Sequence, residues 1–239
     1  MSHSATVSES LAAPGDPPPG KCEAQCLAAA IRTGRCPTDR AFDRLLPEPL
    51  RLVSPDYWTP LAVAKQAAEW LEDQGVRIVV DIGSGAGKFC VAGALFGTCR
   101  FIGLEQHSSL VASARALADL FDLNDRVSFV IGALGAAPTP VGDAYYFFNP
   151  FGDYRLGADH PLEAGAEFTD TRFADDVAAA EDLLQRAPVG TWILTYNGFG
   201  GRVPADYQLI RLDLELPGVL RLWRKQRIGH CAAMSAADK

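Results

Sequence analysis

One stretch, residues 77–89 (RIVVDIGSGAGKF), restricts the fold of this chain more than any other part of the sequence. Residues 78–80 form an unbroken apolar run, which is typical of a strand buried on both faces of a parallel sheet. The glycine-rich segment that follows predicts a tight turn, where the absence of Cβ atoms lets the backbone come close to a ligand. A helix is expected to begin after the turn, with its first N–H groups directed at that ligand. The stretch therefore predicts one strand–turn–helix unit of an α/β sheet, with a binding site at the turn.

A carboxylate stands at the end of each of the first two expected strands. Asp81 ends the first strand, and Glu105 ends a second apolar run that begins at Arg100. In nucleoside-binding α/β units, an acidic residue about 20 positions after the glycine turn accepts hydrogen bonds from ribose hydroxyls. Asp81 can accept hydrogen bonds or pair with an ammonium group. The spacing therefore favours a nucleoside-containing ligand.

Two other glycine motifs fit this spacing poorly. A dinucleotide-binding fingerprint needs glycine at the position of Lys88. A phosphate-binding P-loop needs four residues between its glycines and a Ser or Thr after its lysine, whereas this chain has three residues and Phe89. What the chain does contain is Asp-x-Gly-x-Gly-x-Gly, followed by an acidic residue after the next strand.

In that pattern the chain resembles the class I S-adenosylmethionine-dependent methyltransferases. The residues that carry the resemblance are Asp81, Gly83, Gly85, Gly87 and Glu105. The resemblance implies an α/β fold with a doubly wound, mostly parallel seven-stranded sheet, a C-terminal antiparallel hairpin and an N-terminal helical extension. It implies S-adenosylmethionine as the cofactor and the following residues as its binding set: Asp81, Gly83, Ser84, Gly85, Gly87, Lys88, Glu105, Gln106 and Ala133. Many members carry an acidic residue for the adenine where this chain has Gly132-Ala133-Leu134, so backbone groups and apolar contact are expected to hold the adenine.

A second candidate site follows the expected strand at residues 144–148. Asn149, Pro150 and Phe151 come next, and ligands of open α/β sheets bind beyond the carboxyl ends of the strands. The Asn149 amide oxygen could there accept a hydrogen bond from a substrate amine and align it with the methyl donor. Phe151 could pack on the substrate or face the cationic sulfur. The aromatic residues within the strand are expected to belong to the sheet core.

This segment is similar to the Asn-Pro-Pro-Tyr loop of amino-group methyltransferases, although the second proline is absent and the aromatic residue comes one place early. Its aromatic spacing is similar to the Asn-Asn-Phe segment of the non-SET, seven-strand histone-lysine methyltransferases. The resemblance implies N-methylation of an amine such as a protein lysine, with Asn149, Pro150 and Phe151 as the catalytic residues. An ordinary strand-ending turn would also explain Asn149-Pro150. A methyltransferase acting on an oxygen or carbon of a small molecule, an NAD-dependent oxidoreductase and a non-catalytic cofactor-binding protein remain open.

The rest of the chain is expected to divide around this unit. Residues 1–20, rich in Ser, Ala, Pro and Gly, predict a disordered tail. An N-terminal helical extension is expected over residues 21–74, the methyltransferase domain over 75–230 and a C-terminal tail over 231–239. Within the extension, Thr59 is expected to cap a helix that has Pro60 at its first position. Near the C-terminus, two strand-like runs joined by Pro217-Gly218 predict the hairpin.

Composition agrees with one enzyme-sized domain. The 239 residues are 48% hydrophobic and 21% charged, without an apolar run that could span a bilayer or a secretory signal. A cytoplasmic protein without a membrane partner is therefore expected. The net charge of −7 argues against binding to a nucleic-acid backbone, and the six cysteines lack the spacing of a metal site. The expected partner is a methyl acceptor, either a protein or a small molecule.

Overall fold

The computed structural model describes residues 20–136, 138–151 and 170–227. In this part of the chain, seven strands form one sheet in the order β3-β2-β1-β4-β5-β7-β6. The strands are β1 (Ile78–Ile82), β2 (Arg100–Glu105), β3 (Val127–Ile131), β4 (Ala144–Phe148), β5 (Trp192–Tyr196), β6 (Tyr207–Asp213) and β7 (Leu220–Lys225). The first five strands run parallel, and β7 is antiparallel to both β5 and β6. The predicted doubly wound sheet with a C-terminal hairpin is confirmed.

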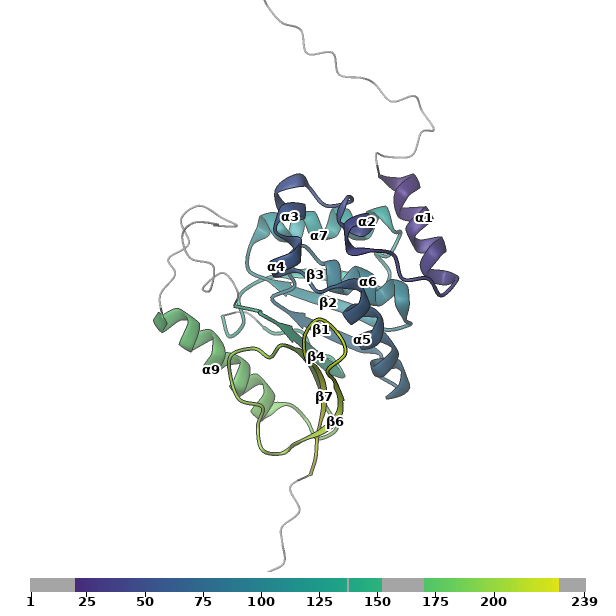
Figure 1. Ribbon diagram of the computed structural model, residues 1–239. Coiled ribbons are helices and arrows are strands. Elements are labelled where there is room, and N and C mark those ends of the chain that lie inside the picture. The colour runs from purple at the N-terminus through teal and green to yellow at the C-terminus, as the bar shows by residue number, and fades with distance from the viewer. Residues whose placement is uncertain (1–19, 137, 152–169, 228–239) are drawn as a thin grey trace, which may run out of the picture.

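Helices cover both faces of this sheet (Figure 1). They are α1 (Lys21–Arg32), α2 (Asp39–Asp43), α3 (Glu48–Leu52), α4 (Ser54–Tyr57), α5 (Leu61–Asp73), α6 (Lys88–Phe96), α7 (Ser108–Leu120) and α9 (Asp170–Arg186). Helices α1, α5, α6 and α7 lie on one face, and α9 lies on the other. Within the described ranges, none of the helices combines the length and the apolar character needed to cross a membrane.

Two hydrophobic cores, one on each face of the sheet, explain why residues 78–80 are all apolar. Side chains alternate along a strand, so Val79 belongs to the core under α5 and α6, whereas Val80 belongs to the core under α9. Both side chains are fully buried. A strand between two helical layers has no solvent-facing side, and this is why residues 78–80 show no polar alternation.

The N-terminal helices share the core of the sheet. Ala24 and Leu27 of α1 and Phe42 of α2 are buried in the same cluster as α5 and α6. The Phe42 ring stacks on Phe121 with 5.5 Å between the ring centres. The helices before β1 are therefore packed as part of the folded body. The expected tails lie outside the described residues, apart from Gly20 at the start of α1.

The beginning of α5 differs from the expectation, and the prediction of Thr59 as its N-cap is wrong. The helix begins at Leu61 with Pro60 as its cap residue, which has no side-chain group to cap it. The Thr59 hydroxyl lies 2.8 Å from the Tyr146 hydroxyl, and the Leu61 N–H donates to Asp39 instead. Thr59 is buried, so its hydroxyl pairs with the nearest buried hydroxyl of the sheet.

Candidate active site

Two narrow hollows lie where the carboxyl ends of β1, β2 and β4 meet. The first encloses about 40 Å³ and is bordered by these residues of the expected set: Gly83, Glu105, Gln106, Ala133, Pro150 and Phe151. The second encloses about 20 Å³ and is bordered by Asp81, Gly83, Ser84 and Lys88, together with Trp58 and Tyr146. Gly83 belongs to both borders. The structure therefore brings most of the expected residues together around the glycine turn.

The turn itself is held between two neighbouring segments. Gly83 and Gly85 have φ angles of +73° and +54°, a region that side chains rarely adopt. A Cβ at Gly83 would lie 2.7 Å from the Pro150 carbonyl oxygen, and one at Gly85 would lie 2.2 Å from the Trp58 ring. Glycine is required at both positions because of the backbone angle and because of the close neighbours.

Glu105 connects the end of β2 to this turn. Its Oε2 accepts a hydrogen bond from the Gly85 N–H at 2.9 Å, and its Oε1 accepts one from the His107 N–H at 2.8 Å. The residue is buried, with 6% of its surface exposed. A carboxylate has about four lone-pair sites, so it can accept further hydrogen bonds from hydroxyl groups of a ligand.

Asp81 is a buried carboxylate on the border of the second hollow. The Cys90 thiol donates to its Oδ2 at 3.3 Å. Burial raises the pKa of Asp81 to about 7, the hydrogen bond from Cys90 opposes this shift, and the Glu105 carboxylate adds to it. A positively charged ligand group at this position would favour the ionised form of Asp81.

Ser84 provides a polar atom that the described part of the chain leaves unsatisfied. Its hydroxyl is buried and has no hydrogen-bond partner within the described residues. Buried polar groups without a partner are rare in folded proteins, and a site for a polar ligand group explains one of them. Ser84 and Asp81 border the same hollow, so this hollow fits a group that carries both a donor and an acceptor.

The ammonium group of Lys88 binds elsewhere than at the turn. Its Nζ lies 2.7 Å from Asp39 Oδ1 and 2.8 Å from Asp43 Oδ1, and it donates to the Ser54 hydroxyl at 3.3 Å. Lys88 therefore ties the start of α6 to the N-terminal helices. Its membership in a cofactor-binding set stays a prediction.

The segment after β4 lies at the expected edge of the sheet. Asn149 adopts a left-handed backbone conformation with a φ of +41°, and it borders a third hollow of about 130 Å³. Phe151 is buried and packs edge-on against Phe173 of α9, with ring centres 6.2 Å apart. Pro150 and Phe151 border both this hollow and the one at Glu105.

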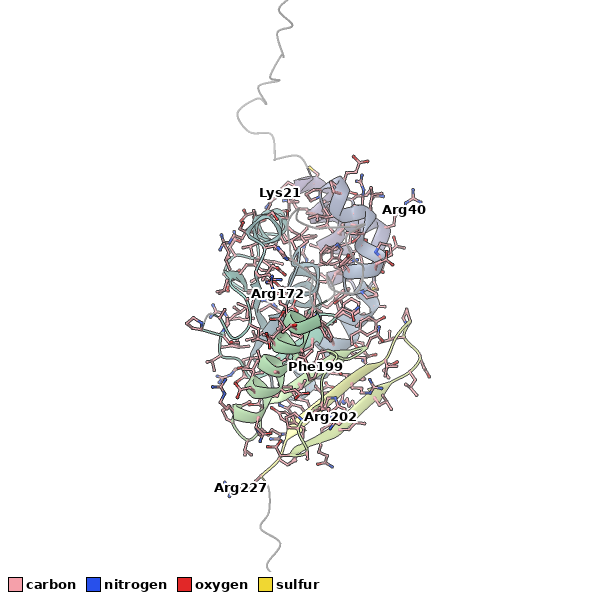
Figure 2. The ribbon with its side chains drawn as sticks, turned by 90° about the vertical axis from the view of Figure 1, so that its left-hand side faces the viewer. Lys21, Arg40, Arg172, Phe199, Arg202 and Arg227 are labelled. Atoms are coloured by element: carbon pink, nitrogen blue, oxygen red, sulfur yellow. The ribbon has the colours of Figure 1, made fainter. Side chains whose placement is uncertain are left out.

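Gln106 links the end of β2 to α9. Its side-chain oxygen accepts a hydrogen bond from Arg172 at 2.8 Å, and Asp176 of α9 borders the same hollow. Figure 2 shows Arg172 at the start of α9. Neither α9 residue has a sequence signal that assigns it to the site.

Sequence reasoning also missed Tyr146 as a neighbour of the turn. Tyr146 was expected only in the sheet core, yet it pairs in register with Asp81 and its ring stacks on Phe89 at 3.6 Å. Burial raises its pKa well above the usual range, and the hydrogen bond between its hydroxyl and that of Thr59 opposes this shift. Tyr146 lies beside Asp81 because of the register between β1 and β4. The alternation of residues within β4 is the closest indication of this contact that the sequence offers.

Comparison with protein-family models and with curated proteins gives no match for this chain. Among solved structures, an RNA methyltransferase from Salinibacter ruber in complex with S-adenosyl-L-homocysteine is 21% identical, with a TM-score of 0.50; the alignment covers 72% of this chain and 96% of that one. An O-methyltransferase from Bacillus cereus in complex with SAH is 14% identical, with a TM-score of 0.53 and coverage of 84% and 97%. The O-methyltransferase TomG from Streptomyces achromogenes, in complex with SAM, is 12% identical, with a TM-score of 0.51 and coverage of 84% and 96%. These likenesses show a shared fold.

Proposed function

We propose that this chain, whose fold is that of the class I S-adenosylmethionine-dependent methyltransferases, binds S-adenosylmethionine and transfers its methyl group to an acceptor. The observation that carries the proposal is the set of polar groups at the glycine turn. Asp81 and Glu105 are buried carboxylates at the ends of adjacent strands, and the buried Ser84 hydroxyl lacks a partner in the described part of the chain.

Each part of the cofactor finds a matching group. Glu105 would accept hydrogen bonds from the ribose hydroxyls. Asp81 would pair with the ammonium group of the methionyl part, and Ser84 would donate to its carboxylate. Ala133 would contact the adenine beside Glu105. The hollows measure about 40 and 20 Å³, whereas ligand pockets usually measure some 300–1,000 Å³, so the neighbouring groups must move apart on binding.

When bound, S-adenosylmethionine supplies a methyl group on a positively charged sulfur, which an acceptor lone pair takes while the electrons of the broken bond stay on sulfur. The residues of the chain then have to orient the acceptor and exclude water. Asn149 would accept a hydrogen bond from the acceptor, and an acceptor amine would lose one proton to solvent. This role of Asn149 carries the proposal that the acceptor atom is a nitrogen, in a protein lysine or in a small molecule.

Isothermal titration calorimetry with S-adenosylhomocysteine and NADH tests the cofactor assignment. Binding of S-adenosylhomocysteine supports it, and binding of NADH alone would replace it with an oxidoreductase. Incubation with radiolabelled S-adenosylmethionine and cell lysate, followed by separation into protein, RNA and small-molecule fractions, tests the transfer. Cofactor binding without label in any fraction would indicate a non-catalytic protein.

Asn149 can be tested without straining its backbone. Asn149→Gly keeps the left-handed conformation and removes the amide, whereas Asn149→Ala also introduces strain. We expect Asn149→Gly to lower the turnover number about tenfold or more while the affinity for S-adenosylhomocysteine stays within about twofold. Unchanged turnover would remove Asn149 from the active site.

A further inference from the structure

A much larger cavity lies beside the candidate site and is not explained by the cofactor. It encloses about 650 Å³ between the N-terminal helices and Pro217 in the turn that joins β6 to β7. Trp58 and Lys88 border this cavity and also the hollow at Asp81. We call it the N-terminal cavity. It shares a wall with the site proposed for the methionyl part of the cofactor, and its volume is that of a small-molecule pocket.

Positive charge predominates around the N-terminal cavity. Its border holds four basic side chains and two acidic ones, namely Arg40, Arg44, Arg51, Lys88, Asp39 and Asp43. Lys88 is ion-paired with both aspartates, and these three groups together carry one net negative charge. Arg44 is paired with Glu23.

The remaining two arginines are available to a ligand. Within the described ranges, the side chains of Arg40 and Arg51 have no hydrogen bond or ion pair. Figure 2 shows Arg40 extending from the surface at the end of the molecule where the N-terminal helices lie. Guanidinium groups bind carboxylates and phosphates through paired hydrogen bonds, and a chain with a net charge of −7 has no general attraction for anions. The local excess of positive charge therefore points to an anionic ligand group at this cavity.

The other walls are mostly apolar. Trp58 presents its buried ring, three prolines, Pro55, Pro60 and Pro217, lie beside it, and the Ser54 hydroxyl, which is bonded to Lys88, completes the border. A cavity that combines an apolar wall with a few charged groups is suited to a small organic molecule with an apolar body and one ionised end.

We propose that the N-terminal cavity binds the methyl acceptor and that this acceptor is a small organic anion, with a carboxylate or phosphate held by Arg51 and Arg40. The apolar body lies along Trp58, on the wall shared with the cofactor site, and the acceptor nitrogen extends from there toward Asn149 at the end of β4. This inference rests on the proposed methyltransferase function. The helices before β1, which precede the glycine turn in the sequence, would then determine which acceptor binds.

The acceptor class is tested with the small-molecule fraction of a lysate, labelled by the full-length protein and radiolabelled S-adenosylmethionine. We expect the labelled product to be retained on an anion-exchange column. Loss of retention after phosphatase treatment identifies a phosphate, and continued retention identifies a carboxylate. Label in the column flow-through, in protein or in RNA overturns the proposal. Absence of label from every fraction, together with no binding of S-adenosylhomocysteine, would instead contradict the proposed function.

The retained fraction then serves as substrate for matched variants. We expect Arg51→Gln to raise the apparent KM about tenfold or more, with the turnover number and the affinity for S-adenosylhomocysteine unchanged within about twofold. Arg51→Lys, which keeps the charge but loses the paired geometry, is expected to have a smaller effect. Arg202→Gln is the control, because Arg202 is exposed near the opposite end of the molecule (Figure 2). An unchanged KM in Arg51→Gln and in the double variant with Arg40→Gln overturns the proposal.

Discussion

The carboxylate of Glu105 accepts a hydrogen bond from the backbone N–H of Gly85 at 2.9 Å, and this contact joins the end of β2 to the turn after β1. The same carboxylate also accepts a hydrogen bond from the His107 N–H. It therefore holds in place both the turn after β1 and the segment after β2. A residue expected only to bind the ribose therefore also shapes the place where the ribose would lie.

Replacing Glu105 should weaken cofactor binding. We expect Glu105→Ala to lower the affinity for S-adenosylhomocysteine about tenfold or more, because hydrogen bonds to a charged group contribute about 1.5–3 kcal/mol. Calorimetry measures the affinity, and circular dichroism checks that the variant is folded. Glu72→Gln is the control, since Glu72 accepts a hydrogen bond from Thr98 on the exposed surface. An unchanged affinity in Glu105→Ala would remove the residue from the cofactor site.

Asp81 should make the ligand-free protein less stable as the pH rises. Folding raises its pKa from 3.8 to about 7, so between these values the folded chain keeps a proton that the unfolded chain has lost. The free energy of unfolding should fall across this range by an amount on the order of 4 kcal/mol. Urea denaturation at a series of pH values measures it, and Asp81→Asn should flatten the profile. Identical profiles for the two proteins would contradict the assignment.

The same group should make cofactor binding depend on pH in the opposite direction. Only ionised Asp81 pairs with the ligand ammonium, so raising the pH from 6 to 8 should increase the affinity for S-adenosylhomocysteine about tenfold. Calorimetry at both pH values tests this. Asp81→Asn should bind weakly and equally at both, and an equal increase in the variant would point to another titrating group.

Lys88 should be a strong determinant of stability. It is 2% exposed and compensates Asp43, whose surface is 6% exposed. Lys88→Met leaves a buried carboxylate unpaired and should lower the free energy of unfolding by about 3–5 kcal/mol. The double variant with Asp43→Asn should recover part of this loss. Lys65→Met, at a surface pair with Glu69, should change stability by less than about 1 kcal/mol and serves as the control.

Replacing Gly85 tests two reasons why the turn needs glycine, namely the positive φ angle and the nearby Trp58 ring. Gly85→Ala must adopt an unfavourable backbone angle and also displace the Trp58 ring, so we expect a loss of about 2–4 kcal/mol. Gly190→Ala also has a positive φ, but nothing lies within 4 Å of its Cβ, and it should lose only about 1 kcal/mol. Thermal denaturation compares the two. Equal losses would show that contact with Trp58 does not constrain the turn.

The local pattern predicted the fold and the turn because both depend on neighbouring residues. The apolar residues Val79 and Val80 required helices on both faces of the sheet, and the positions of Gly83 and Gly85 required a turn. The site beyond the turn depends on contacts between distant segments. Thr59 was expected to cap a helix because of the proline beside it, but its hydroxyl pairs with a sheet residue that lies far away in the sequence.

Lys88 is a second residue whose contacts could not be predicted, because they involve distant segments of the chain. Its place in the motif predicts a role in cofactor binding, which stays a prediction, but the motif does not indicate that its ammonium group binds two aspartates that precede the motif. No spacing rule connects these segments. The pairing depends on where α2 lies relative to the start of α6, which the hydrophobic pattern of either helix leaves open.

The ion pairs of Lys88 also set a lower limit on how far the protein can be shortened. A version that starts at residue 75, where the glycine-turn unit begins, would lack Asp39, Asp43 and Ser54 and would expose the surface of Phe121 that Phe42 covers. A shortened form able to fold by itself should therefore keep at least the segment from Asp39 onward. Relatives that replace Lys88 with an uncharged residue should have lost both aspartates as well, so the two halves of the chain are expected to change together in evolution.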